Sequence, residues 1–318
     1  MSRMTNTPCP PGSVITTQQW ADAGGTRSEL RSELAGQRLV RVRRGVYLRP
    51  PTSDKEELHR LRLTAAAPSL SPNTYFSHTS AAVVHGLPLL GKRTKELVAV
   101  RTGGGHGTIT RTLHTRIAQL GQHEVTVVDE LPVTSLTRTV ADLVRSLPFL
   151  EAVMVADAGL ARGLDRAELL ALTHKGRGCR MARRALLFAD PRAESPGESI
   201  SRVRIDAAGL PTPELQRKVL RVNSTFLARV DFCWEEFGVV GEFDGATKYG
   251  RSLKPGQSPV DAIMDEKRRE QLLFDATWWV VRWTWDELWD NGFEARLRRA
   301  IEARRQQRHP WFAEPTPA

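Results

Sequence analysis

Short apolar runs in the last third of the chain predict a group of β-strands. They occupy 217–222, 226–234, 239–244 and 278–283, and turn-forming residues separate several of them. Helical periodicity flanks them. It predicts helices at 198–208, 259–276 and 285–308, so the order from residue 191 onward is αβββαβ with one more helix at the end.

Three acidic residues interrupt two of these strands: Asp231, Glu242 and Asp244. Acidic residues are rare in strands, and a buried carboxylate is costly unless it is paired or bound to a metal. If the two runs form a hairpin turning in 235–238, Asp231 lies opposite Glu242, with Cβ atoms about 4.5–5.5 Å apart. Asp244 shares that face because it lies two residues beyond Glu242. A divalent metal ion is the simplest explanation of such a set.

Helix and strand signals in 14–49 predict a small unit at the other end of the chain. A short helix comes first, and Thr26 with Glu29 three residues later forms a capping-box pattern at the start of a second helix. The runs 39–43 and 46–48 follow as a basic hairpin. These are the elements of a winged helix-turn-helix, whose second helix enters the DNA major groove. The alternative is a small basic domain that docks on protein. The residues expected to contact DNA are Arg27, Arg31, Arg41, Arg43 and Arg44.

The segment between these two regions mixes helices and strands. His78 and His85 lie seven residues apart on one expected helix, but no carboxylate pattern completes a metal site, so we interpret them as structural. The glycine-rich run 103–107 lacks the lysine and the following helix of a phosphate loop, so we expect a turn. The pattern indicates no catalytic residues in this segment.

Together these elements predict an α/β protein of the α+β multidomain kind. We expect a winged helix-turn-helix domain at 1–50, a mixed α/β domain at 51–190 and an αβββαβ domain at 191–318. Pro50 and Pro51 mark the first boundary, and Pro191 with the Pro196–Gly197 pair marks the second.

Composition adds an expected partner and compartment. The 318-residue chain carries 46 Lys and Arg against 36 Asp and Glu, a net charge of +10. This excess favours a polyanionic partner, above all nucleic acid, although solubility alone is the other interpretation. The three cysteines lie far apart and no stretch is long and apolar enough to span a bilayer. We therefore expect a cytoplasmic protein without a membrane partner.

The C-terminal motifs resemble the PD-(D/E)XK nuclease superfamily, more closely its branch related to very-short-patch-repair endonucleases. The motifs are Glu198-Ser199, Arg229-Val230-Asp231, Gly241-Glu242-Phe243-Asp244-Gly245 and Arg282-Trp283-Thr284-Trp285, and the resemblance covers about 195–290. Earlier in the chain, two motifs are similar to AbiEi-type antitoxins of type IV toxin–antitoxin systems. They are Arg43-Arg44-Gly45-Val46-Tyr47 and the segment from His78-Thr79-Ser80-Ala81-Ala82 to His85-Gly86-Leu87-Pro88.

The nuclease resemblance implies roles for particular residues. Asp231 and Glu242 match the ligands of Mg²⁺ (or Mn²⁺), and Glu198 matches an accessory acidic position. The superfamily places a lysine two residues after the second ligand, where this chain has Asp244, a further candidate ligand. Lys248 is the preferred substitute for that lysine because it is nearer in sequence, and Lys267 is the alternative.

The expected function is a Mg²⁺-dependent endonuclease that is directed to DNA by its own N-terminal domain. The resemblance implies a setting in genome defence or a toxin–antitoxin system, with a cognate toxin or another protein as a further partner. The alternative is a non-catalytic, antitoxin-like transcriptional regulator whose C-terminal domain keeps a vestigial nuclease fold.

Overall fold

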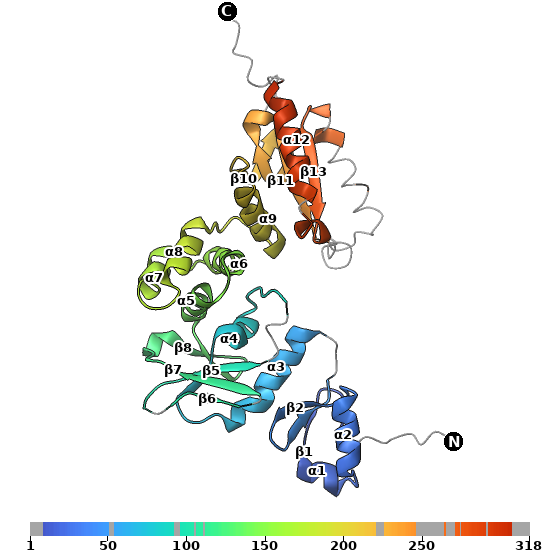
Figure 1. Ribbon diagram of the computed structural model, residues 1–318, viewed down its shortest axis with the longest axis vertical. Coiled ribbons are helices and arrows are strands. Elements are labelled where there is room, and N and C mark those ends of the chain that lie inside the picture. The colour runs from blue at the N-terminus through green and yellow to red at the C-terminus, as the bar shows by residue number, and fades with distance from the viewer. Residues whose placement is uncertain are drawn as a thin grey trace, which may run out of the picture. The chain divides into compact units, whose positions relative to one another are not determined.

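The computed structural model describes residues 9–50, 54–91, 96–104, 106–110, 112–220, 226–245, 264, 271–273, 275–290 and 292–306. The chain forms two compact units. The first comprises Met1–Val155 with Leu164–Leu187, and the second comprises Ala156–Gly163 with Phe188–Ala318 (Figure 1). Helices and three sheets are spread over both units, which confirms the expected multidomain α+β class. The finer boundary expected near residue 50 stays a prediction.

The N-terminal segment of the first unit is a three-stranded antiparallel sheet covered by two helices. Its elements are β1 (Val14–Thr16), α1 (Thr17–Asp22), α2 (Arg27–Ala35), β2 (Val40–Arg43) and β3 (Val46–Leu48), and the strand order is β1-β3-β2. The capping box expected at α2 is present, because the Glu29 N–H donates to Thr26 Oγ1 at 3.2 Å and the Thr26 N–H donates to Glu29 Oε2 at 2.8 Å. Strand β1 was not expected from the sequence.

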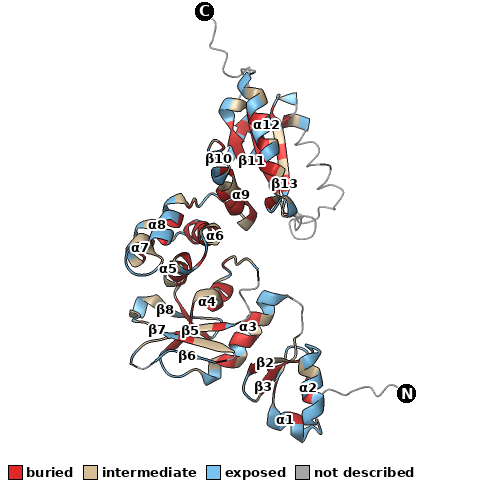
Figure 2. Cartoon of the chain, in the orientation of Figure 1, coloured by how far each residue is buried: buried red, intermediate tan, exposed pale blue. Residues whose placement is uncertain are grey.

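The β2–β3 hairpin is covered on both faces (Figure 2). Tyr47 packs into a cluster with Trp20 and Leu30 of the two N-terminal helices. Val46 and Leu48 instead join the cluster that contains Leu63 of α3 (Lys55–Ala66). Because successive side chains of a strand point to opposite faces, β3 contributes to two neighbouring hydrophobic cores.

The rest of the first unit is built on a six-stranded mixed sheet. Its strand order is β6-β7-β5-β4-β9-β8. The strands are β4 (Thr74–Phe76), β5 (Leu97–Arg101), β6 (Thr108–Ile109), β7 (Leu113–Ile117), β8 (Val125–Val128) and β9 (Leu131–Thr134). The helices that follow α3 are α4 (His78–His85), α5 (Leu136–Ser146), α6 (Phe149–Ala161), α7 (Arg166–Leu172) and α8 (Cys179–Phe188). Of these, α6 passes into the second unit at Ala156, and α8 ends in it at Phe188. Short 3₁₀ turns lie at Ala67–Ser69 and Gln122–Glu124.

The second unit contains a four-stranded sheet in the order β10-β11-β12-β13. Strand β11 is antiparallel to both β10 and β12, and β13 is parallel to β12. The elements are α9 (Pro196–Ala207), β10 (Glu214–Leu220), β11 (Phe226–Trp234), β12 (Val239–Asp244), β13 (Trp279–Thr284) and α12 (Gly292–Gln306), with 3₁₀ turns at Glu235–Phe237 and Asp286–Leu288. They follow the predicted order. Most of the helix expected at 259–276 lies outside the described residues.

Helix α9 packs closely on this sheet because two glycines leave room. A Cβ at Gly197 would lie 1.9 Å from the Phe243 ring, and a Cβ at Gly241 would lie 2.6 Å from the Trp283 ring. Trp283 is fully buried, stacks on Phe293 at 4.8 Å, and donates its indole N–H to Ser201 Oγ on α9 at 2.7 Å. This packing fixes the start of α9 against the ends of β11 and β12.

We predict that Gly197→Ala destabilises the second unit, although alanine normally favours a helix over glycine by about 1 kcal/mol. The added methyl group enters the Phe243 ring, and overpacking of this kind costs about 1–3 kcal/mol. Urea denaturation followed by tryptophan fluorescence measures the change. Gly104→Ala is the control, because nothing lies within 4 Å of its Cβ position.

Adding Phe243→Leu to Gly197→Ala removes most of the ring that the methyl group meets. We therefore expect the double variant to lose less stability than the sum of the two single losses. Simple additivity would show that Gly197 does not act through Phe243.

Candidate functional site

Glu198 stands in the first turn of α9, where it also caps the helix. The Glu198 N–H donates to Ser195 Oγ at 3.2 Å, and the Ser195 hydroxyl donates to Glu198 Oε1 at 2.7 Å. The Glu194 N–H donates to Glu198 Oε2 at 2.9 Å. The spacing from Ser195 to Glu198 is a capping-box signal that was available in the sequence. Part of the role of Glu198 is therefore to hold the start of the helix.

Gln216 brings Glu198 and Asp231 together. It lies on β10, where the register pairs Leu215 with Phe232 and Arg217 with Val230, so Gln216 stands beside Asp231. Its side-chain Nε2 donates to Glu198 Oε2 at 2.9 Å and to Asp231 Oδ1 at 3.4 Å. Sequence reasoning missed Gln216, because a single glutamine on a strand next to charged residues carries no distinctive pattern.

Strand β11 pairs with β12 in the predicted register from Trp234–Val239 to Phe232–Gly241, which confirms the hairpin with its turn at 235–238. The paired residues end one step before Asp231 and Glu242, so the expected opposition of these two side chains stays a prediction. Asp231 is half-buried, and its Oδ2 accepts the backbone N–H of Phe243 at 2.9 Å. With Gln216 on the other oxygen, Asp231 is held by hydrogen bonds to both neighbouring strands.

Glu242 is buried and makes an ion pair with the neighbouring strand. Its Oε2 lies 3.2 Å from Arg282 Nη2, and the parallel register pairs Glu242 with Arg282 directly. Asp244 ends β12 and is half-buried. Lys248 and Lys267, the two candidate replacements for the motif lysine, lie outside the described residues.

The Glu198–Asp231 pair is electrostatically strained. Burial raises the pKa of Glu198, and the nearby Asp231 charge raises it further, while hydrogen bonds from Glu194, Ser195 and Gln216 oppose the shift. A positive charge close to Glu198 would lower its pKa and so oppose the effects of burial and of the Asp231 charge. Within the described part of the chain, no group of three or more His, Cys, Asp or Glu side chains is arranged to hold a metal ion.

The basic residues predicted to contact DNA are mostly accessible. Arg27 and Arg31 on α2 are exposed, as are Arg43 and Arg44 at the β2–β3 turn. Arg41 is half-buried, and its Nε donates to the Arg43 carbonyl at 3.4 Å. Nearby, Glu33 forms two ion pairs, from its Oε1 to Arg38 Nε at 2.8 Å and from its Oε2 to Arg49 Nη2 at 3.0 Å.

A basic cavity in the first unit was not found from the sequence. It has a volume of about 490 Å³, and His78 and four arginines line it together with Asp142. The arginines are spread from Arg116 to Arg177, so no local motif shows them. The sequence interpretation of His78 as a purely structural residue did not include its arginine neighbours.

None of the described helices has the length and hydropathy needed to cross a membrane. No known family model matches the sequence. Two proteins of Mycobacterium tuberculosis, the uncharacterized MT2308 of strain CDC 1551 and Rv2248 of strain H37Rv, are each 27% identical over 262 residues, which covers 77% of this chain and 93% of the relative. The crystal structure of RV2827C from the same species matches with a TM-score of 0.35 and 16% identity, over 66% of this chain and 84% of that one.

We predict that Glu198→Gln flattens part of the pH dependence of stability. The folded pKa of Glu198 lies above its ordinary value of 4.5, so between these two values the folded state binds more protons than the unfolded state. The wild-type free energy of unfolding therefore falls as pH rises through this window. Urea titrations across the window should show a smaller fall for Glu198→Gln.

Glu302→Gln, on an exposed position of α12, is the matched control and should follow the wild type. An identical pH profile for wild type and Glu198→Gln would show that the charge of Glu198 is not strained.

Proposed function

We propose that this protein binds DNA and hydrolyses its phosphodiester bonds at a Mg²⁺-dependent site in the second unit. The observation that carries the proposal is the meeting of Glu198 and Asp231. They come from α9 and β11, separate elements of the fold, yet both accept hydrogen bonds from the Gln216 amide. Two carboxylates held together, one buried and one half-buried, are a feature of metal-dependent and acid–base sites more than of a structural core.

The arrangement of the second unit supports this proposal. A helix, three antiparallel strands and a fourth strand parallel to the third occur in the order expected for the PD-(D/E)XK-like domain. Asp231 and Glu242 directly follow the last β11–β12 pair, Phe232–Gly241, on their two strands, and Asp244 ends β12. These are the positions at which the sequence motifs are similar to those of the nuclease superfamily.

The chemistry of the donor set fits a hard divalent cation. Carboxylate oxygens are the ligands that Mg²⁺ prefers. Burial, and after it the Asp231 charge, raises the pKa of Glu198, and a nearby cation would oppose both effects. Asp231 and Glu198 would hold the ion; Glu242 and Asp244, which the resemblance also implies as ligands, do not complete a group of three with them in the described part of the chain. When bound, such an ion polarises the phosphodiester and lowers the pKa of a coordinated water.

The protein groups around these carboxylates have their own roles. Gln216 and the Phe243 N–H orient the two oxygens of Asp231. Arg282 places a guanidinium beside Glu242 on the next strand. A cation in this position can offset negative charge that develops on a phosphate during cleavage, a role that the superfamily motif gives to lysine.

We predict that Asp231→Asn abolishes Mg²⁺-dependent nicking of supercoiled plasmid. The amide keeps the size of the side chain but removes the charge that would hold the ion. We expect a loss of at least about 100-fold in rate, since losing a charged group in a preorganised site typically costs this much or more. DNA affinity should be unchanged.

Asp206→Asn is the matched control, because Asp206 lies exposed near the end of α9. Equal nicking by wild type and Asp231→Asn would contradict the assignment and point to a contaminating nuclease.

A second candidate is a non-catalytic, antitoxin-like regulator that acts by binding DNA and a toxin partner. The Glu242–Arg282 ion pair favours it, because one expected metal ligand already has a cationic partner on β13. Both candidates require DNA binding, whereas only the nuclease cuts, so the two can be separated by assaying binding and nicking on the same preparation.

We predict that Arg43→Ala combined with Arg44→Ala weakens DNA binding similarly for all sequences. Both side chains are exposed at the β2–β3 turn, where they can reach phosphates. The slope of log affinity against log salt should fall by about one for each phosphate that the variant no longer neutralises. Fluorescence anisotropy at several salt concentrations measures it. Arg38→Ala is the control, since Arg38 pairs with Glu33, and an unchanged slope in the double variant would contradict an N-terminal DNA interface.

A further inference from the structure

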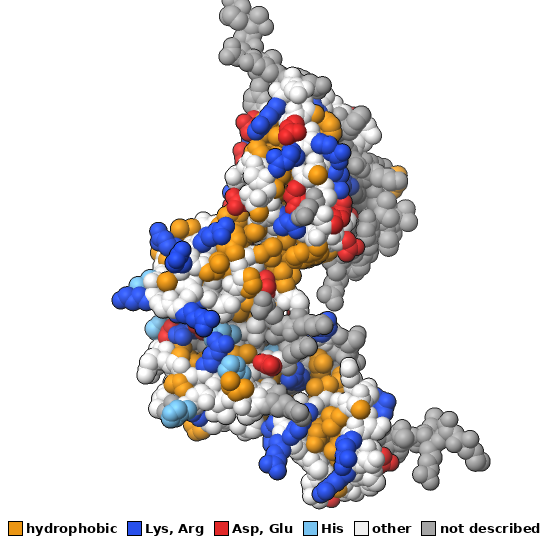
Figure 3. All heavy atoms as spheres, viewed as in Figure 1, with side chains coloured by type: hydrophobic (Ala, Val, Ile, Leu, Met, Phe, Trp, Pro, Cys, Tyr) orange, Lys and Arg blue, Asp and Glu red, His pale blue; other side chains and the backbone are white. Residues whose placement is uncertain are grey.

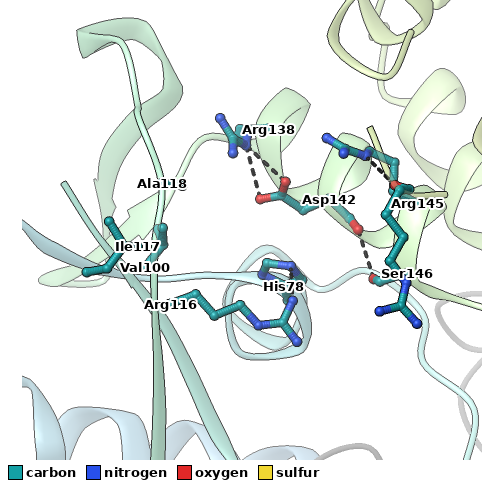
Figure 4. A pocket seen from close by; sticks show the side chains of 10 residues that line it. His78, Val100, Arg116, Ile117, Ala118, Arg138, Asp142, Arg145 and Ser146 are labelled. Carbon is teal, nitrogen blue, oxygen red and sulfur yellow. Dashed lines mark hydrogen bonds and ion pairs between the residues drawn. The ribbon is translucent and has the colours of Figure 1, made fainter. Parts of the chain in front are cut away.

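The basic cavity of the first unit is formed by elements that are far apart in sequence. His78 is the first residue of α4, Arg116 lies on β7, and Arg138, Asp142 and Arg145 lie on α5 (Figure 4). Arg177 follows α7. All of them line a space of about 490 Å³. Ligand pockets in proteins are typically about 300–1,000 Å³. The cavity is therefore large enough for a small organic molecule.

The carboxylates near the cavity, Asp142 and Glu124, both form ion pairs with Arg138. Arg138 contacts Asp142 through Nε at 3.0 Å and Glu124 through Nη1 at 2.8 Å. Burial lowers the pKa of Arg138, but its two carboxylate partners outweigh this and raise it overall. The positive charge of Arg138 is thus balanced by Asp142 and Glu124. Among the described residues, Arg116, Arg145 and Arg177 form no ion pair with a carboxylate, so the lining has excess positive charge.

The cavity wall is built around Arg145. Its Nε donates to the Arg177 carbonyl at 3.2 Å, which ties α5 to the loop after α7. That loop passes so close that a Cβ at Gly178 would lie 2.0 Å from the Arg145 carbonyl oxygen, and one at Gly176 would lie 2.7 Å from Arg145 Nη2. Both glycines also have positive φ, +88° and +82° for Gly176 and Gly178. The close packing of this loop against Arg145 keeps both Arg145 and Arg177 in the lining of the cavity.

His78 adds a neutral hydrogen-bonding group. Arg116 Nη1 lies 3.1 Å from His78 Nε2, and because a guanidinium can only donate, Nε2 accepts. The other ring nitrogen, Nδ1, then carries the proton and donates to Ser77 Oγ at 3.1 Å. Burial lowers the pKa of His78, in keeping with this neutral form. The imidazole therefore orients Arg116 toward the cavity.

We propose that this cavity binds a phosphate monoester of a small organic molecule, of about the size of a mononucleotide. Three guanidinium groups without carboxylate partners in the described part of the chain match a terminal phosphate, which carries close to two negative charges, better than the single charge of a phosphodiester. Val100, Ile117 and Ala118 form an apolar part of the lining, which is suited to the organic portion. This site is separate from the acidic site and does not depend on nuclease activity.

Titration calorimetry on the full chain at low ionic strength tests the proposal. Deoxyadenosine monophosphate should bind saturably and inorganic phosphate should compete with it, whereas deoxyadenosine should not bind. Arg116→Gln and Arg177→Gln should each weaken nucleotide binding about tenfold or more, as expected when a charged hydrogen bond is removed. Arg183→Gln, at an exposed position on α8 outside the cavity lining, should stay within about twofold of wild type.

A second comparison identifies the source of the phosphate. A single-stranded oligonucleotide with a 5′-phosphate should compete with the nucleotide more strongly than the same oligonucleotide with a 5′-hydroxyl if a nucleic acid end is the natural ligand. If the two oligonucleotides compete equally weakly, the natural ligand is a free phosphate monoester. The proposal is overturned if wild type shows no saturable phosphate binding while its circular dichroism is that of a folded protein. Equal losses in Arg183→Gln and Arg116→Gln would overturn it too.

Discussion

The close packing of α9 on β12 is the constraint on which the second unit depends. Gly197 lets the helix approach the Phe243 ring, and Gly241 lets the Trp283 ring lie over β12. Because Glu198 follows Gly197 directly, this contact sets the distance between the helix and the acidic strand ends. A larger residue at either glycine would separate Glu198 from Asp231 even if every carboxylate were retained. The candidate chemistry thus depends on two residues that have no side chain.

The two candidate sites gather side chains of opposite charge. In the second unit, carboxylates are brought together and held by neutral groups, the Gln216 amide and the Phe243 N–H, with one guanidinium beside Glu242. In the first unit, arginines converge and the nearby carboxylates neutralise only Arg138. Figure 3 shows Lys and Arg side chains spread over the visible surface of the described residues, with Asp and Glu among them. The net charge of +10 therefore does not locate either site, and only the local pairing does.

The sequence predicted the parts of the fold that short-range patterns determine. The β11–β12 register follows from the turn at 235–238, since fixing the turn fixes which residues face each other, and the capping box at Thr26 was likewise readable. The Glu242–Arg282 pairing depends on a crossover between β12 and β13, whose register no local signal sets. Gln216 and the arginines of the basic cavity were missed for the same reason, because tertiary packing brings them together across many residues.

The β2–β3 hairpin has a consequence for how the first unit would meet a long ligand. Val46 and Leu48 belong to the core around α3, while Tyr47 belongs to the core under α1 and α2. The hairpin therefore cannot swing without opening two cores at once, unlike a wing that projects into solvent. Arg43 and Arg44 are carried on a backbone that is ordered before any encounter. Binding through them would lose little backbone entropy, so more of the contact free energy would appear as affinity.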